Sequence, residues 1–180
     1  MLGRQLRGRG RLARQERDRP QVGRADAVLR GWFRTTSTTG GRLLGFGNAQ
    51  TGLSSSYERS LSLTNAGKVV FGVFTGLVVT VVSPAAYNDG AWHEAVATMD
   101  GTLGGGGMRL YVDGVPVAAN ANILSQPGIG YWRIGYDNLA NWGAATPTTY
   151  GPTGAVDDAA VYATVLTPAK VSAHYAAGRF

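Results

Sequence analysis

From residue 29 onward, apolar and polar residues alternate in short runs that are separated by clusters of Gly, Asn, Asp and Ser. Alternation with a period of two is typical of β-strands whose two faces meet different surroundings. Strands divided by turn signals roughly every 8–12 residues favour an all-β sandwich or barrel. The pattern predicts strands over 29–36, 42–46, 57–64, 68–74, 77–82, 92–99, 108–112, 115–118, 132–135 and 155–162.

Two hairpins are predicted from their turn residues. Asp113-Gly114 separates two apolar runs, and a type I′ turn needs a positive φ at both positions, which Asp tolerates and Gly adopts freely. The apolar run Val69–Val82 contains Gly72 and Gly76. A membrane-spanning helix needs about 20 apolar residues, so this shorter run is interpreted as two buried strands that turn near Thr75-Gly76, and no membrane span is expected.

One helix is predicted, at the C-terminus. Thr167 is suited to the N-cap, Pro168 to the first helical position and Gly178 to the end. Val171 and Tyr175 are four residues apart and therefore share a face, which we expect to pack on the sandwich.

The net charge of +6 is confined to the first 30 residues, which hold nine Arg, no Lys and three acidic residues. Residues 31–180 carry eight basic and eight acidic side chains, so the predicted folded part is neutral and nucleic acid is not an expected partner. The chain has no Cys, which excludes disulfides and thiol chemistry.

Residues 1–28 lack aromatic residues and are predicted to be disordered. Three interpretations remain open for this arginine-rich segment. It is an arm that binds nucleic acid or another polyanion, or a targeting segment. Or it is a non-native sequence that arises from a shifted reading frame in a GC-rich gene. No apolar stretch follows the basic residues, so no signal peptide is predicted.

Four segments in order carry a family resemblance: 92–101 (WHEAVATMDG), 110–114 (LYVDG), 132–138 (WRIGYDN) and 154–162 (GAVDDAAVY). Together they resemble the LamG-like (laminin G-like) jellyroll domain of the concanavalin A-type lectin/glucanase superfamily, over roughly residues 32–178. The resemblance implies an all-β, two-sheet antiparallel jellyroll with a short C-terminal helix over 29–180. It further implies a module of a larger bacterial protein, extracellular or on the cell surface, with glycans as partners.

Hydrolytic relatives of this sandwich use closely spaced acids on one strand. A glycosidase needs two carboxyl groups about 5–9 Å apart. Here Glu58 and Glu94 lie on different predicted strands, and the adjacent Asp157 and Asp158 point to opposite faces. The chain is therefore predicted not to be an enzyme, with a glycoside hydrolase or polysaccharide lyase as the alternative.

The resemblance also implies a structural Ca²⁺, with Asp157 as a ligand. A hard cation takes six to eight oxygen ligands, which one carboxylate, backbone carbonyls and waters could supply. The alternative is that Asp157 and Asp158 only solvate a strand edge.

Aromatic and polar residues gather between 132 and 142, in the combination that suits a sugar site: aromatic faces against C–H groups, and Asp, Asn or Arg for hydroxyls. The alternative is that the aromatic residues belong to the core and the Asn residues to turns. The candidate ligand-binding residues are Trp132, Arg133, Tyr136, Asp137, Asn138 and Trp142. The predicted function is a binding or spacer module, with carbohydrate or cell-surface glycans as the specific ligand.

Overall fold

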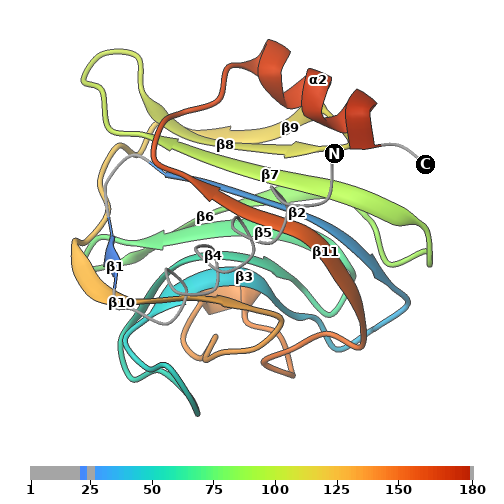
Figure 1. The fold of residues 1–180 in the computed structure, drawn as a ribbon. Coiled ribbons are helices and arrows are strands. Elements are labelled where there is room, and N and C mark those ends of the chain that lie inside the picture. The colour runs from blue at the N-terminus through green and yellow to red at the C-terminus, as the bar shows by residue number, and fades with distance from the viewer. Residues whose placement is uncertain (1–20, 24–26, 179–180) are drawn as a thin grey trace, which may run out of the picture.

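The protein is a sandwich of two antiparallel β-sheets with the helix α2 outside it (Figure 1). The computed structural model describes residues 21–23 and 27–178, so most of the arginine-rich segment lies outside the described residues. One sheet has six strands in the order β1-β10-β3-β4-β5-β6, and the other has five in the order β11-β2-β7-β8-β9. The strands are β1 (Gln21–Gly23), β2 (Ala27–Thr35), β3 (Gly41–Gly47), β4 (Tyr57–Leu63), β5 (Lys68–Phe74), β6 (Val78–Ala86), β7 (Trp92–Asp100), β8 (Gly107–Val112), β9 (Val115–Asn120), β10 (Gly128–Ile134) and β11 (Gly154–Tyr162). The predicted two-sheet jellyroll is confirmed.

The core lies between the two sheets and is built from alternate residues of each strand. Phe71 and Val73 of the six-stranded sheet meet Ala97 and Leu110 of the five-stranded sheet in one buried cluster. Because side chains alternate along a strand, the residues between them face away from this core. Val96 of β7 accordingly belongs to a second cluster on the outer face of the five-stranded sheet.

The predicted turns are confirmed. Asp113 and Gly114 have φ values of 54° and 76° between β8 and β9. The apolar run Val69–Val82 divides into β5 and β6, which pair directly and turn through Gly76 at a φ of 101°.

The helix α2 (Pro168–Gly178) covers the outer face of the five-stranded sheet (Figure 1). The backbone N–H of Lys170 donates to Thr167 Oγ1 at 3.3 Å, which confirms Thr167 as the cap. Val171 is fully buried, and the ring of Tyr175 stacks on Trp32 at a centroid distance of 5.6 Å. No described helix has the length and apolar character needed to cross a membrane.

The described strands begin before residue 29. Gln21–Gly23 form β1, which pairs with β10, and β2 begins at Ala27. β10 likewise begins at Gly128 rather than at Trp132. β1 and the first part of β10 form by pairing with each other, although they are distant in sequence. A three-residue edge strand or a Gly-Ile-Gly run carries no alternation from which a strand could be predicted.

Candidate functional site

The segment that follows β10 folds back across the outer face of the six-stranded sheet. Within it, Trp142 precedes the short 3₁₀ helix η1 (Gly143–Ala145) and is only 4% exposed. Its ring lies directly against Gly72 of β5, where a Cβ would be 2.1 Å from Trp142 Cζ3. The ring of Tyr57 lies beside it, with a centroid distance of 6.4 Å. Because Gly72 has no side chain, the indole of Trp142 can lie directly on the sheet.

A pocket of about 270 Å³ opens beside this indole. Its walls come from the facing ends of β3 and β4, the β5–β6 hairpin, the segment before β10 and the loop that carries Trp142. Aromatic rings form much of the wall, from Phe46, Tyr57, Phe74 and Trp142. Polar side chains complete it, from Asn48, Ser55, Ser56, Glu58, Gln126 and Asn141.

Glu58 is the one carboxylate among the described residues that line the pocket, and it is only 7% exposed. Its Oε2 accepts a hydrogen bond from Arg59 Nη1, whereas its Oε1 is buried without a hydrogen bond. Burial raises the pKa of the Glu58 carboxyl to about 7, even though the neighbouring Arg59 acts to lower it. This carboxyl therefore changes its charge near neutral pH.

A bulge in β4 places Glu58 and Arg59 together. The pairing register with β3 shifts opposite Gly45 and Phe46, and Arg59 has a φ of 42°. Such a bulge breaks the strict alternation of faces, so two neighbouring side chains can both be buried. Arg59 Nη2 also donates to Ser125 Oγ at 2.7 Å, which ties β4 to the segment before β10.

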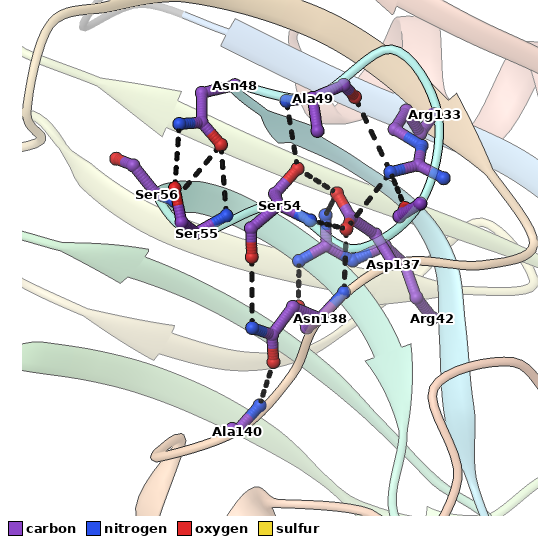
Figure 2. Close-up of polar contacts among 11 residues, drawn as sticks. Arg42, Asn48, Ala49, Ser54, Ser55, Ser56, Arg133, Asp137, Asn138 and Ala140 are labelled. Atoms are coloured by element: carbon purple, nitrogen blue, oxygen red, sulfur yellow. Dashed lines mark hydrogen bonds and ion pairs between the residues drawn. The ribbon is translucent and has the colours of Figure 1, made fainter.

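Asp137 is fully buried and binds side chains and backbone groups of several segments (Figure 2). Its Oδ1 accepts hydrogen bonds from the backbone N–H groups of Ser54 and Asn138, at 2.8 and 2.7 Å. Its Oδ2 accepts from Ser54 Oγ at 2.7 Å and from Arg42 Nη1 at 3.4 Å. Arg133 Nη1 completes the set at 3.1 Å from Oδ1. Asp137 thus joins the loop before β4 to the loop after β10.

Neighbouring side chains fix the same two loops. Asn138 Nδ2 donates to Ser54 O at 2.9 Å, and its Oδ1 accepts from the N–H of Ala140 (Figure 2). Asn48 Oδ1 accepts from the N–H groups of Ser55 and Ser56, both at 3.1 Å. These bonds hold the polar rim of the pocket in place before any ligand arrives.

The structure places the six predicted ligand-binding residues in different surroundings. Trp132 is half-buried, with its ring 5.1 Å from that of Phe46, and the Arg133 guanidinium is turned inward to Gly52 O and Asp137. Tyr136 is 49% exposed and lies apart from the lining of the pocket. Asp137 and Asn138 serve the framework described above. Of the six, Trp142 alone is among the described residues that line the pocket.

Phe46, Tyr57 and Glu58 line the pocket but were not among the predicted ligand-binding residues. One signal was present: a Glu-Arg pair stands in the middle of an otherwise strand-like run, where charged residues are rarely buried unless they are paired or functional. The spacing of acids alone could not reveal a pocket that is built from segments distant in sequence.

The two glutamates of the sandwich lie in different sheets. Glu58 is on β4 of the six-stranded sheet, and Glu94 is on β7 of the five-stranded sheet. Glu94 is fully buried and pairs with Arg30 Nε at 2.5 Å. The two carboxyls therefore do not form a pair in one site.

Asp157 is exposed on β11, next to a register shift that leaves Asp158 with a φ of 46°. Its Oδ1 accepts a hydrogen bond from the N–H of Asp158 at 2.8 Å. The described residues contain no group of three or more His, Cys, Asp or Glu side chains placed to hold a metal ion. A site made of one carboxylate with backbone carbonyls is of a different kind, so Ca²⁺ at Asp157 stays a prediction from the resemblance.

The fold is that of a two-sheet antiparallel jellyroll domain. The family model described as the concanavalin A-like lectin/glucanases superfamily matches residues 21–172. The chain therefore belongs to this superfamily. No curated protein sequence matches it.

Several solved structures share this fold. A pentraxin of Limulus polyphemus has a TM-score of 0.62 at 16% identity, covering 86% of this chain and 71% of the pentraxin. The CBM40 module of Ruminococcus gnavus IT-sialidase, bound to α2,3-sialyllactose, has a TM-score of 0.62 at 20% identity, covering 91% and 86%. Trypanosoma rangeli sialidase has a TM-score of 0.55 at 18% identity, and the match covers only 22% of it. These TM-scores show a shared fold.

Proposed function

We propose that this chain is a non-catalytic carbohydrate-binding module and that a sugar ring binds in the pocket beside Trp142. The observation that carries the proposal is the composition of this pocket, where aromatic walls from Phe46, Tyr57 and Phe74 face polar side chains on fixed loops. Sugars present both C–H faces and hydroxyl groups, and such a lining offers partners for both. The sugar-bound CBM40 module, which shares this fold, supports the proposal.

The size of the pocket suits a single ring. Ligand pockets usually range from about 300 to 1,000 Å³, and a volume of about 270 Å³ lies just below that range. We therefore expect the pocket to take one sugar unit at the end or side of a glycan rather than a long chain.

The enzymatic alternative is a glycoside hydrolase or polysaccharide lyase. Hydrolysis by the usual route needs a second carboxyl about 5–9 Å from the first. Among the described residues that line the pocket, Glu58 has no carboxylate partner, and Glu94 lies in the other sheet. This arrangement supports binding without turnover.

The superfamily and its sugar-binding neighbours support an extracellular or cell-surface role. In that setting the ligands would be glycans of a cell surface or of a secreted polysaccharide. The domain would then serve as one module of a larger protein that brings it to its target.

Glycan-array binding of the full chain tests the proposal. Ser56 is exposed at the rim, so Ser56→Trp fills the pocket mouth, whereas Ser172→Trp adds the same side chain on α2, on the other sheet. We expect binding to selected glycans that Ser56→Trp abolishes and Ser172→Trp retains. The nine arginines of the first 30 residues attract acidic polymers in a salt-dependent way. This non-specific binding should be the same in both variants. Binding that Ser56→Trp leaves intact would contradict the proposal.

Turnover is tested on the same glycans. Release of reducing ends measures hydrolysis, and ultraviolet absorbance of unsaturated products measures lyase activity. We expect neither. Activity that disappears in Glu58→Gln would favour the enzyme.

A further inference from the structure

The charges around the pocket are arranged asymmetrically. Among the described residues that line it, Glu58 is the one formally charged side chain, and neither Lys nor Arg contributes to its wall. A ligand in the pocket therefore meets a carboxyl group and neutral hydrogen-bonding groups.

The nearby arginines direct their donors into the protein. Arg59 is fully buried, and its Nη atoms donate to Glu58, Ser125 Oγ and Gln126 O. Arg42 is fully buried and donates to Asp137 and to Asn138 O. The strongest recognition of a ligand carboxylate uses a charged donor aimed at the site, typically a bidentate arginine. These two arginines do not supply it.

Glu58 has unused accepting capacity. Glu58 lines the pocket, its Oε1 is buried without a hydrogen bond, and the backbone N–H groups of Phe74 and Gln126 act with Arg59 to lower the pKa of its carboxyl. A buried acceptor of this kind costs free energy until a donor satisfies it. A sugar hydroxyl is such a donor, whereas a second carboxylate would be repelled.

From this arrangement we infer that the pocket selects a neutral sugar ring and discriminates against sugars that carry a carboxylate, with Glu58 as the residue that sets this specificity. The inference rests on the proposed carbohydrate-binding function and names its ligand class. Two charges of the same sign repel at a few ångströms even with a high effective dielectric constant. Arg59 offsets part of the Glu58 charge, and we expect the remaining repulsion to weaken binding by about tenfold.

The discrimination depends on pH. Burial raises the pKa of Glu58 to about 7, so the side chain is largely ionised at pH 8 and protonated at pH 5.5. Arg59 from the same strand pairs with it, and Tyr57 is the other titratable residue among those described in the lining. Burial raises the pKa of Tyr57 as well, so this phenol stays neutral over the whole interval. Glu58 alone in the lining therefore changes charge between pH 5.5 and pH 8.

The test uses matched sugars on the full chain: galactose with galacturonate, glucose with glucuronate, and lactose with sialyllactose, each immobilised in the same way. Only binding that Ser56→Trp removes is counted. At pH 8 we expect each neutral member to bind at least about tenfold more tightly than its carboxylated partner. At pH 5.5 the ratio should fall severalfold, as the Glu58 carboxyl takes up its proton.

Two variants separate Glu58 from other charges. Glu58→Gln keeps an amide oxygen for Arg59 and should lower the ratio at pH 8 to the value seen at pH 5.5, with no further change with pH. Asp158→Asn removes an equal charge from an exposed position on β11 and should leave the ratio unchanged.

The outcomes are distinct. Pocket-dependent binding that prefers the carboxylated sugars, or a ratio that neither pH nor Glu58→Gln alters, overturns the specificity and leaves the carbohydrate-binding function standing. Absence of pocket-dependent binding to any glycan overturns both.

Discussion

The indole ring of Trp142 rests on the backbone of Gly72, at a point where any side chain would collide with it: a Cβ at residue 72 would lie 2.1 Å from Trp142 Cζ3. Residue 72 belongs to β5, and residue 142 belongs to the loop that follows β10 in the chain. Both strands are in the six-stranded sheet. The contact therefore fixes one wall of the pocket.

Gly72→Ala is expected to displace this indole. Overpacking of a tightly packed site costs about 1–3 kcal/mol, so the free energy of unfolding should fall by that amount, and binding in the pocket should be lost. Urea unfolding and glycan binding measure the two effects. Gly105→Ala is the matched control, because Gly105 has open space around its Cβ position, and its stability should change by less than about 0.5 kcal/mol. Wild-type stability in Gly72→Ala would show that the indole is not held at this point.

Asp137→Asn is expected to destabilise the protein strongly. Burial lowers the pKa of Arg42 to about 10, so this guanidinium is still charged at pH 7 and would lose its ionised partner. Breaking a buried ion pair from one side costs about 3–5 kcal/mol. Chemical unfolding measures the loss, and the exposed Asp158→Asn should stay within about 0.5 kcal/mol of the wild type. A small effect at residue 137 would mean that the pair adds little to the framework.

His93 is expected to make stability depend on pH. Its Nδ1 lies 2.7 Å from Asp113 Oδ2 and its Nε2 3.1 Å from Asp89 Oδ1, and these hydrogen bonds raise the pKa of the imidazole. Because the folded-state pKa is above the unfolded value of about 6.5, the stabilisation is complete below pH 6.5 and is lost as the pH rises through the folded-state value.

Urea unfolding between pH 6 and pH 9 measures this loss. The pKa of Glu58 is also raised, so it too destabilises the fold as the pH rises toward 7, and the comparison is best made in a Glu58→Gln background. In that background stability should decline with pH, and His93→Gln should flatten the curve. A decline that persists in the double variant would assign it to another group.

Calcium at Asp157 is the prediction taken from the family resemblance. A ligand that binds only the folded state at a hundredfold excess over its Kd stabilises it by about 2.7 kcal/mol. If Asp157 holds the ion, melting in calcium and in chelator should differ by several degrees, and Asp157→Ala should remove the difference. Coincident melting curves would exclude a stabilising metal.

The sequence was enough for the local structure. The Asp113-Gly114 turn, the division of Val69–Val82 into two strands and the cap at Thr167 all depend on residues within a few positions of each other. Alternation likewise places Ala97 and Val96 on opposite faces of β7, and in the structure Ala97 lies in the cluster between the sheets and Val96 in the cluster beneath the helix. Such signals are readable because backbone preferences and side-chain periodicity act over short distances along the chain.

The tertiary structure alone decided the pocket. Asp137 was a sugar-binding candidate by composition, yet contacts with Ser54 and Arg42, 83 and 95 residues away, make it a buried framework residue. In the sequence, Glu58 is a glutamate without a second acid on its own strand. Its raised pKa follows from desolvation by the segments that cover β4. Burial and electrostatics depend on which distant segments meet, so a side chain's neighbours, and through them its chemistry, are fixed only when the two sheets and their covering loops assemble.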